Sequence, residues 1–335
     1  VGLNWLRIEG ADKYSKNPGR VGRNLSFRND IIEAEVQAQI FFYDIQDLGV
    51  RFYTYISTMC YVMEACAENK KEMIVLDRPN PNGFYVDGPV LDKNYKSFVG
   101  MQPVPVVYGM TIGEYACMIA GERWLNDDAN KAYDYYKTEA ENSVDTPFHF
   151  LVIKCANYNH KSLYKLPIKP SPNLADMGSI YCYPSTCFFE GTVISEGRGT
   201  DEPFRIFGHP SLPENLYAFM PAAREWAKEP KCLNQQCYGW HISGNEHDVL
   251  KELDGKIQFK YLIEAYELFP DKKKFFLAPS SSNAQDYFFN KLAGNNELMQ
   301  QIIDGKTEDE IRKSWQPALD AFKMIRKKYL LYDDF

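Results

Sequence analysis

Two apolar runs joined by a helical pattern decide the fold. The first reads IFFYD at residues 40–44 and the second reads MIVLD at residues 73–77, each ending in an aspartate. Between them, residues 51–67 carry apolar side chains at helical spacing, namely Tyr55, Met59, Met63 and Cys66. Continuous apolar runs are typical of parallel strands buried on both faces, and the crossover between such strands is right-handed. The stretch therefore predicts a βαβ unit of an α/β protein.

Asp44 and Asp77 follow the two predicted strands directly. In open parallel sheets, ligands bind beyond the carboxyl ends of the strands, so both side chains are expected near a site. An aspartate at this position also caps turns, which is the alternative role. The following loop, RPNPNG at residues 78–83, contains two prolines and an Asn-Gly turn, so it is expected to be rigid.

Further elements are expected on both sides of a Pro- and Ser-rich stretch at residues 165–179, which we interpret as the crossing between two domains. Capping boxes predict helix starts at Thr111 and Thr307. The second of these helices would carry Trp315, Leu319, Phe322 and Ile325 on one face. Short strands are predicted at residues 103–107, 149–154, 255–259 and 274–277. The first 39 residues predict no element.

Length and composition limit the classes of protein to which this chain can belong. The 335 residues carry 38 Lys+Arg against 45 Asp+Glu, a net charge of −7, and are 45% hydrophobic, which is typical of a globular chain of about two domains. The pI near 5.4 argues against nucleic acid or anionic lipid as the main partner. No apolar run reaches the ~20 residues that span a bilayer.

The cysteines and histidines give no support for a metal site. Eight cysteines include two C-x4-C spacings, Cys182/Cys187 and Cys232/Cys237, and neither spacing matches the paired C-x2-C of a zinc site. Buried thiols or one or two disulfides are the expected roles. The five histidines form no metal-binding motif.

The densest charged motif is FEGTVISEGRGTD at residues 189–201. Its charges lie beside an apolar run and need partners, either an internal network of the Glu196–Arg198 type or a polar ligand. Paired carboxylates suit glycoside hydrolysis, in which one protonates the leaving oxygen and the other acts as nucleophile or base. Glu190 and Glu196 are the candidate pair, and Asp44 and Glu114 are further acids. For Glu114, a helix cap is the alternative role.

Other enzyme signatures are missing from the sequence. No G-x-G-x-x-G follows a predicted strand, and neither a P-loop nor a G-x-S-x-G elbow occurs. Dinucleotide binding, P-loop phosphoryl transfer and α/β-hydrolase chemistry are therefore unsupported. A nucleotide-sugar enzyme is a weaker third hypothesis, and the lack of a Gly-rich phosphate loop counts against it.

Several ordered motifs resemble a known family. They are DIQDLGVRFYTY (44–55), LDRPNP (76–81), GMTIGE (109–114), PSPN (170–173), EGT with SEGRGT (190–192 and 195–200), SWQP (314–317) and RKKY (326–329). Together they are similar to the NamZ-type exo-β-N-acetylmuramidases, long labelled only as a domain of unknown function.

The resemblance implies a Rossmann-like N-terminal domain with a mostly parallel sheet at residues 1–165. It also implies a smaller mixed α/β domain at residues 166–335, with a cleft between them. It implies exo-hydrolysis of N-acetylmuramic acid from non-reducing ends of peptidoglycan fragments, in cell-wall turnover, without metal or organic cofactor. The protein would be periplasmic or secreted, often after removal of a signal peptide, and its partner would be a saccharide such as MurNAc-GlcNAc.

One departure from the family pattern supports an alternative. The family carries a Ser-Pro-Glu-His-Gly block, with a proposed catalytic Glu, upstream of the motif that begins at Asp44. No Glu-His-Gly occurs in this sequence, and only 43 residues precede Asp44. We expect that this region is either missing from the chain or diverged. The alternative function is a non-catalytic muropeptide- or sugar-binding protein that keeps the cleft.

The sequence thus yields a set of candidate site residues. Catalytic roles are predicted for Glu190, Glu196, Glu114 and Asp44. Substrate contacts are predicted for Asp47, Arg51, Tyr53, Asp77, Arg78, Asn80, Asn82, Ser171, Asn173 and Arg198. An arginine such as Arg51, Arg78 or Arg198 could hold the lactyl carboxylate of N-acetylmuramic acid with two parallel hydrogen bonds.

Overall fold

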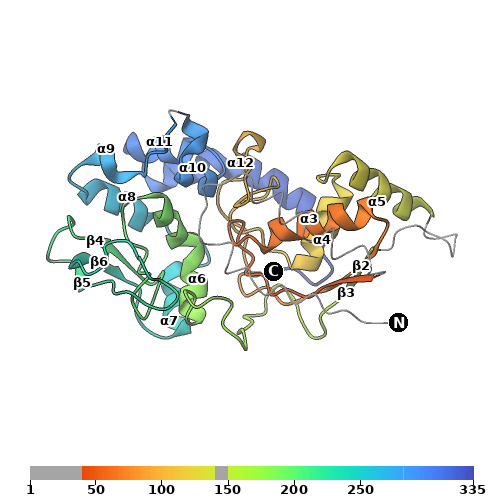
Figure 1. Cartoon of the computed structure of the whole chain (residues 1–335), viewed down its shortest axis with the longest axis horizontal. Coiled ribbons are helices and arrows are strands. Elements are labelled where there is room, and N and C mark those ends of the chain that lie inside the picture. The colour runs from red at the N-terminus through yellow and green to blue at the C-terminus, as the bar shows by residue number, and fades with distance from the viewer. Residues whose placement is uncertain (1–39, 140–149, 282) are drawn as a thin grey trace.

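The computed structural model describes residues 40–139, 150–281 and 283–335, which form two lobes side by side (Figure 1). The first lobe contains β1 (Ile40–Tyr43), α3 (Tyr55–Glu68), β2 (Glu72–Leu76), η1 (Lys93–Tyr95), α4 (Ile112–Gly121), α5 (Asp127–Glu139) and β3 (Phe150–Ile153). The second lobe begins with α6 (Met177–Thr186), η2 (Cys187–Gly191), β4 (Ile206–His209), β5 (Tyr217–Phe219), β6 (Cys237–His241) and α7 (Glu246–Leu253). It continues with α8 (Lys260–Leu268), α9 (Lys272–Phe275), η3 (Ala284–Asp286), α10 (Phe288–Ala293) and α11 (Glu297–Ile303). The chain ends with α12 (Glu308–Arg326) and η4 (Lys327–Tyr329).

The first lobe confirms the predicted βαβ unit. Its sheet has the order β1-β2-β3 with every described pair parallel, so Asp44 and Asp77 follow neighbouring strands at the same edge. One face of the sheet packs through Tyr43, Met73 and Val75 on α3, α4 and α5. On the other face, Phe42 is 39% exposed and Leu151 is 47% exposed. The parallel strands were predicted correctly, but among the described residues their burial is one-sided.

Helix starts follow the local sequence signals. At α4, the Thr111 hydroxyl accepts a hydrogen bond from the Glu114 N–H, and the Glu114 carboxylate accepts one from the Thr111 N–H. The same box opens α12 at Thr307, as predicted. α3 begins only at Tyr55, because residues 51–54 form a turn.

Three of the short predicted strands were wrong. Residues 103–107 contribute only isolated bridges, from Val107 to Val50 and Asp87, because Pro103 and Pro105 have no N–H for a ladder. Residues 255–259 form the irregular approach to α8. Residues 274–277 include the end of α9 and one isolated bridge. The prediction at 149–154 is confirmed as β3, although His149 lies outside the described residues.

The second lobe is a mixed α/β unit. Its sheet is antiparallel with the order β4-β6-β5. An aromatic core lies between this sheet and the helices, built around Phe188, Phe189, Phe207 and Phe289. This architecture confirms the predicted second, mixed domain.

α12 belongs to both cores. Ile311, Trp315 and Leu319 pack in the core of the second lobe, whereas Phe322 packs in the core of the first. Figure 1 shows this helix running along the top of the molecule from one lobe to the other. No helix among the described residues is both long and apolar enough to cross a membrane.

Candidate functional site

Among the candidate site residues, an exposed polar pair lies at the carboxyl edge of the first lobe's sheet. Arg78 donates a hydrogen bond to the Asp44 carboxylate at 2.6 Å, which joins the ends of β2 and β1. The side chains are 40% and 34% exposed, so a ligand at this edge could reach both. The position of Asp44 agrees with the strand-end location that was expected for Asp44 and Asp77.

Asp47 lies deeper at the same edge, 4% exposed. Its carboxylate accepts hydrogen bonds from the Gly49 N–H at 2.7 Å and from the Tyr108 hydroxyl, while Oδ1 has no partner in the structure. Burial raises the pKa of Asp47 to about 6, although these two hydrogen bonds act in the opposite direction. Asp47 therefore titrates close to neutral pH without a cation beside it.

Asp77 is held by four donors. They are the N–H groups of Arg78 and Gly113, at 3.0 and 2.8 Å, and the hydroxyls of Thr111 and Tyr332, at 2.7 and 2.6 Å. A Cβ at Gly113 would come within 2.7 Å of the Asp77 carboxyl carbon, so a glycine is needed at this contact. Burial raises the pKa of Asp77 above its ordinary value despite these donors. The carboxylate is thus committed to contacts within the protein.

Arg51 is fully buried and joins the two lobes. Its guanidinium donates four hydrogen bonds of 2.7–2.8 Å to the backbone carbonyls of Pro89, Val104, Leu292 and Ala293. Burial without a carboxylate partner lowers its pKa to about 9. Arg51 presents no exposed donor to a lactyl carboxylate, so its contacts support a structural role.

Asn80 and Asn82 in the loop after β2 are also buried, and they fasten this loop to the segment before α4 and to the loop after β1. Asn80 donates to the Met110 carbonyl at 2.8 Å, and Asn82 donates to the Leu48 carbonyl at 2.9 Å. Gly49 has φ +73°, and a Cβ there would lie 2.1 Å from the Asn80 amide nitrogen. These contacts hold the edge rigid and leave Asp44 and Arg78 as its exposed groups.

Glu114 serves as the helix cap that the sequence offered as its alternative role. It has no exposed surface, and besides Thr111 it accepts hydrogen bonds from the Leu331 N–H at 2.8 Å and from His160 Nε2 at 3.0 Å. His160 Nδ1 faces the Gly83 carbonyl at 3.2 Å. The contacts of Glu114 therefore support a structural role over a catalytic one.

The second lobe carries a charge cluster made of Glu190, Glu196, Arg198 and Lys231. Arg198 bonds Glu190 and Glu196 through separate nitrogens, each at 2.9 Å, and Lys231 Nζ lies 3.2 Å from the other Glu196 oxygen. Burial alone would raise the pKa of Glu196, but the charges of Lys231 and Arg198 outweigh it and lower that pKa to about 2. The internal network of the Glu196–Arg198 type, one of the two alternatives that the sequence left open, is present in the structure.

Lys231 also holds the backbone around this cluster. Its ammonium donates to the carbonyls of Phe189 and Thr192 at 2.7 and 2.8 Å, and more weakly to those of Glu190 and Ile194. Glu196 is 4% exposed at the side chain, whereas Glu190 is 20% and Arg198 is 31% exposed. Lys231 is 26% exposed, so a ligand can reach Glu190, Arg198 and Lys231, whereas Glu196 is shielded.

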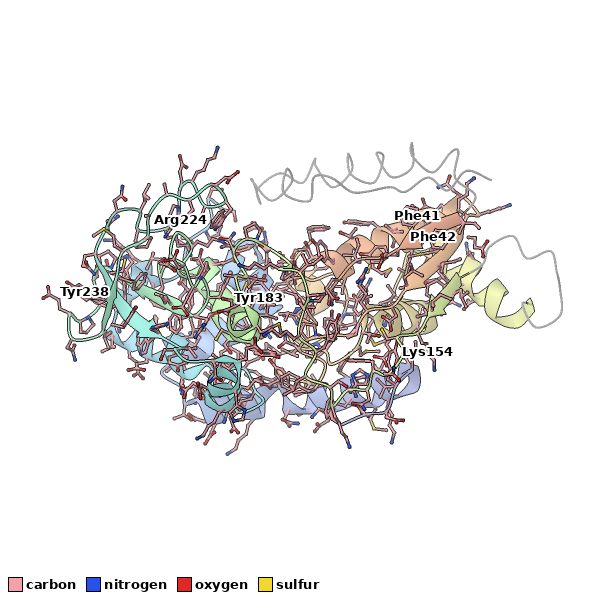
Figure 2. All side chains as sticks on the ribbon, turned by 90° about the horizontal axis from the view of Figure 1, so that it is seen from below. Phe41, Phe42, Lys154, Tyr183, Arg224 and Tyr238 are labelled. Carbon is pink, nitrogen blue, oxygen red and sulfur yellow. The ribbon has the colours of Figure 1, made fainter. Side chains whose placement is uncertain are left out.

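Aromatic rings connect the charge cluster to the loop that holds Ser171 and Asn173. The Tyr53 hydroxyl donates to the Pro170 carbonyl at 3.1 Å, and its ring lies 6.0 Å from that of Tyr183. Tyr183 packs on Phe204 at 4.9 Å, and the Arg198 guanidinium lies 5.2 Å from the same ring. Figure 2 shows Tyr183 in the middle of the molecule. The structure thus brings Tyr53 and the Ser171–Asn173 loop toward the charge cluster.

Sequence reasoning missed Lys231, Tyr108 and Tyr332, which contact three of the candidate carboxylates. Lys231 stands between a proline and a cysteine, and no spacing connects it with Glu196. Tyr332 lies near the end of the chain, far in sequence from Asp77. Only the tertiary fold assembles these pairs.

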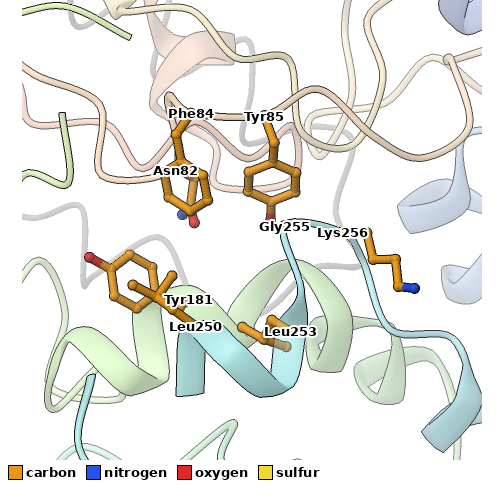
Figure 3. Close-up of a pocket in the computed structure, with 8 residues that line it drawn as sticks. All are labelled: Asn82, Phe84, Tyr85, Tyr181, Leu250, Leu253, Gly255 and Lys256. Atoms are coloured by element: carbon orange, nitrogen blue, oxygen red, sulfur yellow. The ribbon is translucent and has the colours of Figure 1, made fainter. Parts of the chain in front are cut away.

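Two hollows in the structure differ greatly in size. One lies between Asn82, Phe84, Tyr85 and α7 (Figure 3), and its volume of about 10 Å³ has room for roughly one water molecule but not for a sugar. The other is a pocket of about 510 Å³, lined by Lys165, Asp176, Gly178, Arg205 and residues 244–247. Neither hollow is a cleft between the two sheets, and the predicted cleft stays a prediction. Among the described residues, no group of three or more His, Cys, Asp or Glu could hold a metal ion.

The structure has two α/β lobes, and the second lobe carries a pair of glutamates. Comparison with known families places this architecture in a class of two-domain glycoside hydrolases. Residues 29–178 match the N-terminal model and residues 181–332 the C-terminal model of the family described as exo-β-N-acetylmuramidase NamZ. The chain belongs to this family. The matches meet between residues 178 and 181, and the predicted domain boundary at residue 165 stays a prediction.

Individual relatives agree with this membership. The peptidoglycan β-N-acetylmuramidase NamZ of Bacillus subtilis strain 168 is 35% identical over 309 residues, covering 88% of this chain and 67% of the relative. Two crystal structures of DUF1343 family proteins from Bacteroides fragilis NCTC 9343 are also similar. One has 42% identity and a TM-score of 0.78 over 90% of this chain and 78% of that one. The other has 26% identity and a TM-score of 0.70 over 90% and 77%.

Proposed function

We propose that the chain is an exo-acting β-N-acetylmuramidase that removes N-acetylmuramic acid from the non-reducing ends of peptidoglycan fragments during cell-wall turnover. The observation that carries this proposal is the match of both family models, which together span most of the chain. The activity in the printed name of the Bacillus subtilis relative points the same way. We place the protein's action in the periplasm or outside the cell, where peptidoglycan lies, and fractionation of cells expressing the chain tests this location.

The charge cluster supports a division of roles between its two glutamates. Because Lys231 and Arg198 lower the pKa of Glu196 to about 2, Glu196 is ionised at neutral pH and cannot donate a proton. Its role in this proposal is a fixed negative charge that orients Arg198. Glu190 shares Arg198 and is more exposed, so it is the carboxylate of the cluster that we assign to the sugar.

Substrate contacts in this proposal come from the junction between the lobes. Arg198 would hold the lactyl carboxylate, while Tyr53 and the Ser171–Asn173 loop would contact the sugar and its N-acetyl group. Asn173 contributes a buried Oδ1 that has no partner in the structure, and a ligand amide N–H could donate to it. Asp44 and Arg78 offer a second exposed polar pair at the sheet edge.

A second candidate function is a muropeptide-binding protein without hydrolase activity. The observation that favours it is the low pKa of Glu196, which removes one of the two glutamates of the charge cluster as a proton donor. Asp47, with a pKa raised to about 6, is the described carboxyl best matched to acid catalysis, but it is buried.

Release of free N-acetylmuramic acid from MurNAc-GlcNAc tests the proposal, with GlcNAc-MurNAc as the control substrate. Release from the first substrate alone supports exo-muramidase activity. Glu190→Gln is then expected to lower kcat/KM by about 10²–10⁴-fold, whereas Glu225→Gln at an exposed position of the same lobe leaves it unchanged. Binding measured by calorimetry without any release would favour the binding protein instead.

A further inference from the structure

Two cysteines bracket the turn that leads into β6. Cys232 follows Lys231 directly and adopts φ +56°, and Cys237 is the first residue of β6. The Gln235 N–H donates to the Cys232 carbonyl at 3.0 Å, which closes the turn. The Asn234 N–H donates to the Pro221 carbonyl at 2.8 Å, which anchors the turn outside β6. The backbone therefore curls Cys232 back toward Cys237.

The two cysteines share one small apolar cluster. Cys237 is fully buried in a small cluster with Ile206 and Phe219, and the half-buried Cys232 packs on this cluster. A hydrogen bond with Cys237, reinforced by the charge of Lys231, lowers the pKa of the Cys232 thiol, whereas this hydrogen bond and burial raise that of Cys237. Cys232 is thus the more accessible and more nucleophilic sulfur of the pair.

A second pair with the same spacing provides an internal comparison. Cys182 lies inside α6 and Cys187 begins the following 3-10 turn, and both are buried. Cys187 has Tyr183 as its hydrogen-bond partner, and burial raises the pKa of both thiols. The C-x4-C spacing alone therefore does not pair two cysteines, and the turn at residues 232–235 makes the difference.

We propose that Cys232 and Cys237 form a redox-active dithiol, which a small-molecule disulfide or a dithiol–disulfide oxidoreductase converts into an intramolecular disulfide. The Cys232 thiolate attacks one sulfur of the oxidant's disulfide and releases the other as a thiolate. Cys237 then loses its proton and attacks the Cys232 sulfur, which expels the second oxidant thiolate. Two protein thiols are oxidised to one disulfide, and one oxidant disulfide is reduced to two thiols.

The bond would act on the charge cluster through the neighbouring residue. Lys231 holds the backbone carbonyls of residues 189–194 and faces Glu196, and it directly precedes Cys232. A disulfide between Cys232 and Cys237 at the start of β6 reduces the conformational freedom of the backbone segment that carries Lys231. Oxidation is therefore expected to stiffen the backbone of residues 187–196 as well as the turn itself.

The test equilibrates the folded protein with excess oxidised glutathione or with a reducing agent, then alkylates and digests it. The peptide holding Cys232 and Cys237 is expected to lose the mass of two hydrogens and to resist alkylation, while the Cys182 and Cys187 thiols stay reduced. Amide hydrogen exchange of residues 187–196 is expected to be slower, and Tm higher by a few degrees, in the oxidised protein.

Cys232→Ser is the matched variant, since its half-buried position tolerates the change better than Cys237 does. This variant is expected to show no response of exchange or Tm to oxidised glutathione. Two alkylatable thiols at residues 232 and 237 after oxidation would overturn the disulfide. A disulfide with unchanged exchange at residues 187–196 would overturn the link to Lys231. Neither readout depends on the proposed hydrolase activity.

Discussion

Two buried carboxylates, one in each lobe, have pKa values shifted in opposite directions. At the sheet edge of the first lobe, Asp47 has only neutral partners, the Gly49 N–H and the Tyr108 hydroxyl, and burial raises its pKa to about 6. In the second lobe, Glu196 is equally buried but faces two cations, and its pKa falls to about 2. Burial disfavours the ionised form of both carboxylates, so the neighbouring groups decide whether the pKa rises or falls. A buried carboxylate alone therefore does not identify an acid catalyst.

The largest expected effect comes from removing a cation of the charge cluster. Lys231→Met leaves Glu196 with one cation and leaves backbone carbonyls between residues 189 and 194 without their donor. Removal of one partner from a buried ion pair costs about 3–5 kcal/mol. We expect a loss of this size in the free energy of unfolding, measured by urea denaturation at pH 7.

Lys228→Met is the control for this variant, because Lys228 is exposed three residues earlier in the same segment. It is expected to change the free energy of unfolding by less than about 0.5 kcal/mol. Equal losses in the two variants would show that Lys231 is no more than a surface charge, and the contrast between the lobes would lose its basis.

The next effect is a pair of opposite pH dependences. The lowered pKa of Glu196 gives stability that is fully present above about pH 4.5 and is lost as the pH falls toward 2. The raised pKa of Asp47 means that the folded state holds a proton that the unfolded state releases, so stability falls as the pH rises from about 3.8 to 6. Each contribution is on the order of 3 kcal/mol.

Unfolding measured from pH 3 to 7 separates the two groups. The stability difference between the wild type and Glu196→Gln is expected to shrink below pH 4.5. The difference between the wild type and Asp47→Asn should instead shift in favour of the variant between pH 4 and 6. Parallel curves for wild type and both variants would contradict the assigned environments.

The smallest expected effect lies at Asp77, which has four donors. Tyr332→Phe removes one of them, at 2.6 Å, and leaves three. It also removes the hydroxyl that accepts a hydrogen bond from the Cys155 N–H at 2.8 Å. We expect a loss of about 2 kcal/mol in the free energy of unfolding, since the usual net contribution of one hydrogen bond is about 1 kcal/mol. Tyr217→Phe, at an exposed position of β5, serves as the control. A loss above about 3 kcal/mol would mean that Tyr332 contributes far more to stability than these two hydrogen bonds.

Sequence patterns within a few residues predicted those parts of the fold that interactions between near neighbours in the sequence determine. The βαβ unit and both capping boxes are confirmed, because apolar periodicity and N-cap chemistry act within a few residues. The strand predicted at residues 103–107 failed because its apolar side chains suit a strand while its prolines prevent a ladder. Burial on one face of the β1-β2-β3 sheet depends on what packs there, which the strand sequence does not specify.

The candidate site was predictable in part. Glu196 and Arg198 are two residues apart, so their pairing was one of the two alternatives drawn from the sequence. Asp44 and Arg78 meet because parallel strands end at one edge. Arg51 could not be recognised as the bridge to Leu292 and Ala293, since a buried guanidinium and a ligand-binding one look alike in sequence. Whether the candidate residues act on a sugar stays a prediction for the variants above.

The return of α12 to the first lobe has a consequence for biosynthesis. Phe322 completes the core of β1, β2 and α3, and the segment after the helix supplies partners to Glu114, Asp77 and His160. A nascent chain emerging from the ribosome makes the strands of the first lobe early and their last packing partners late. Co-translational folding, which usually completes an N-terminal domain first, is therefore expected to finish the first lobe only after the second has been synthesised.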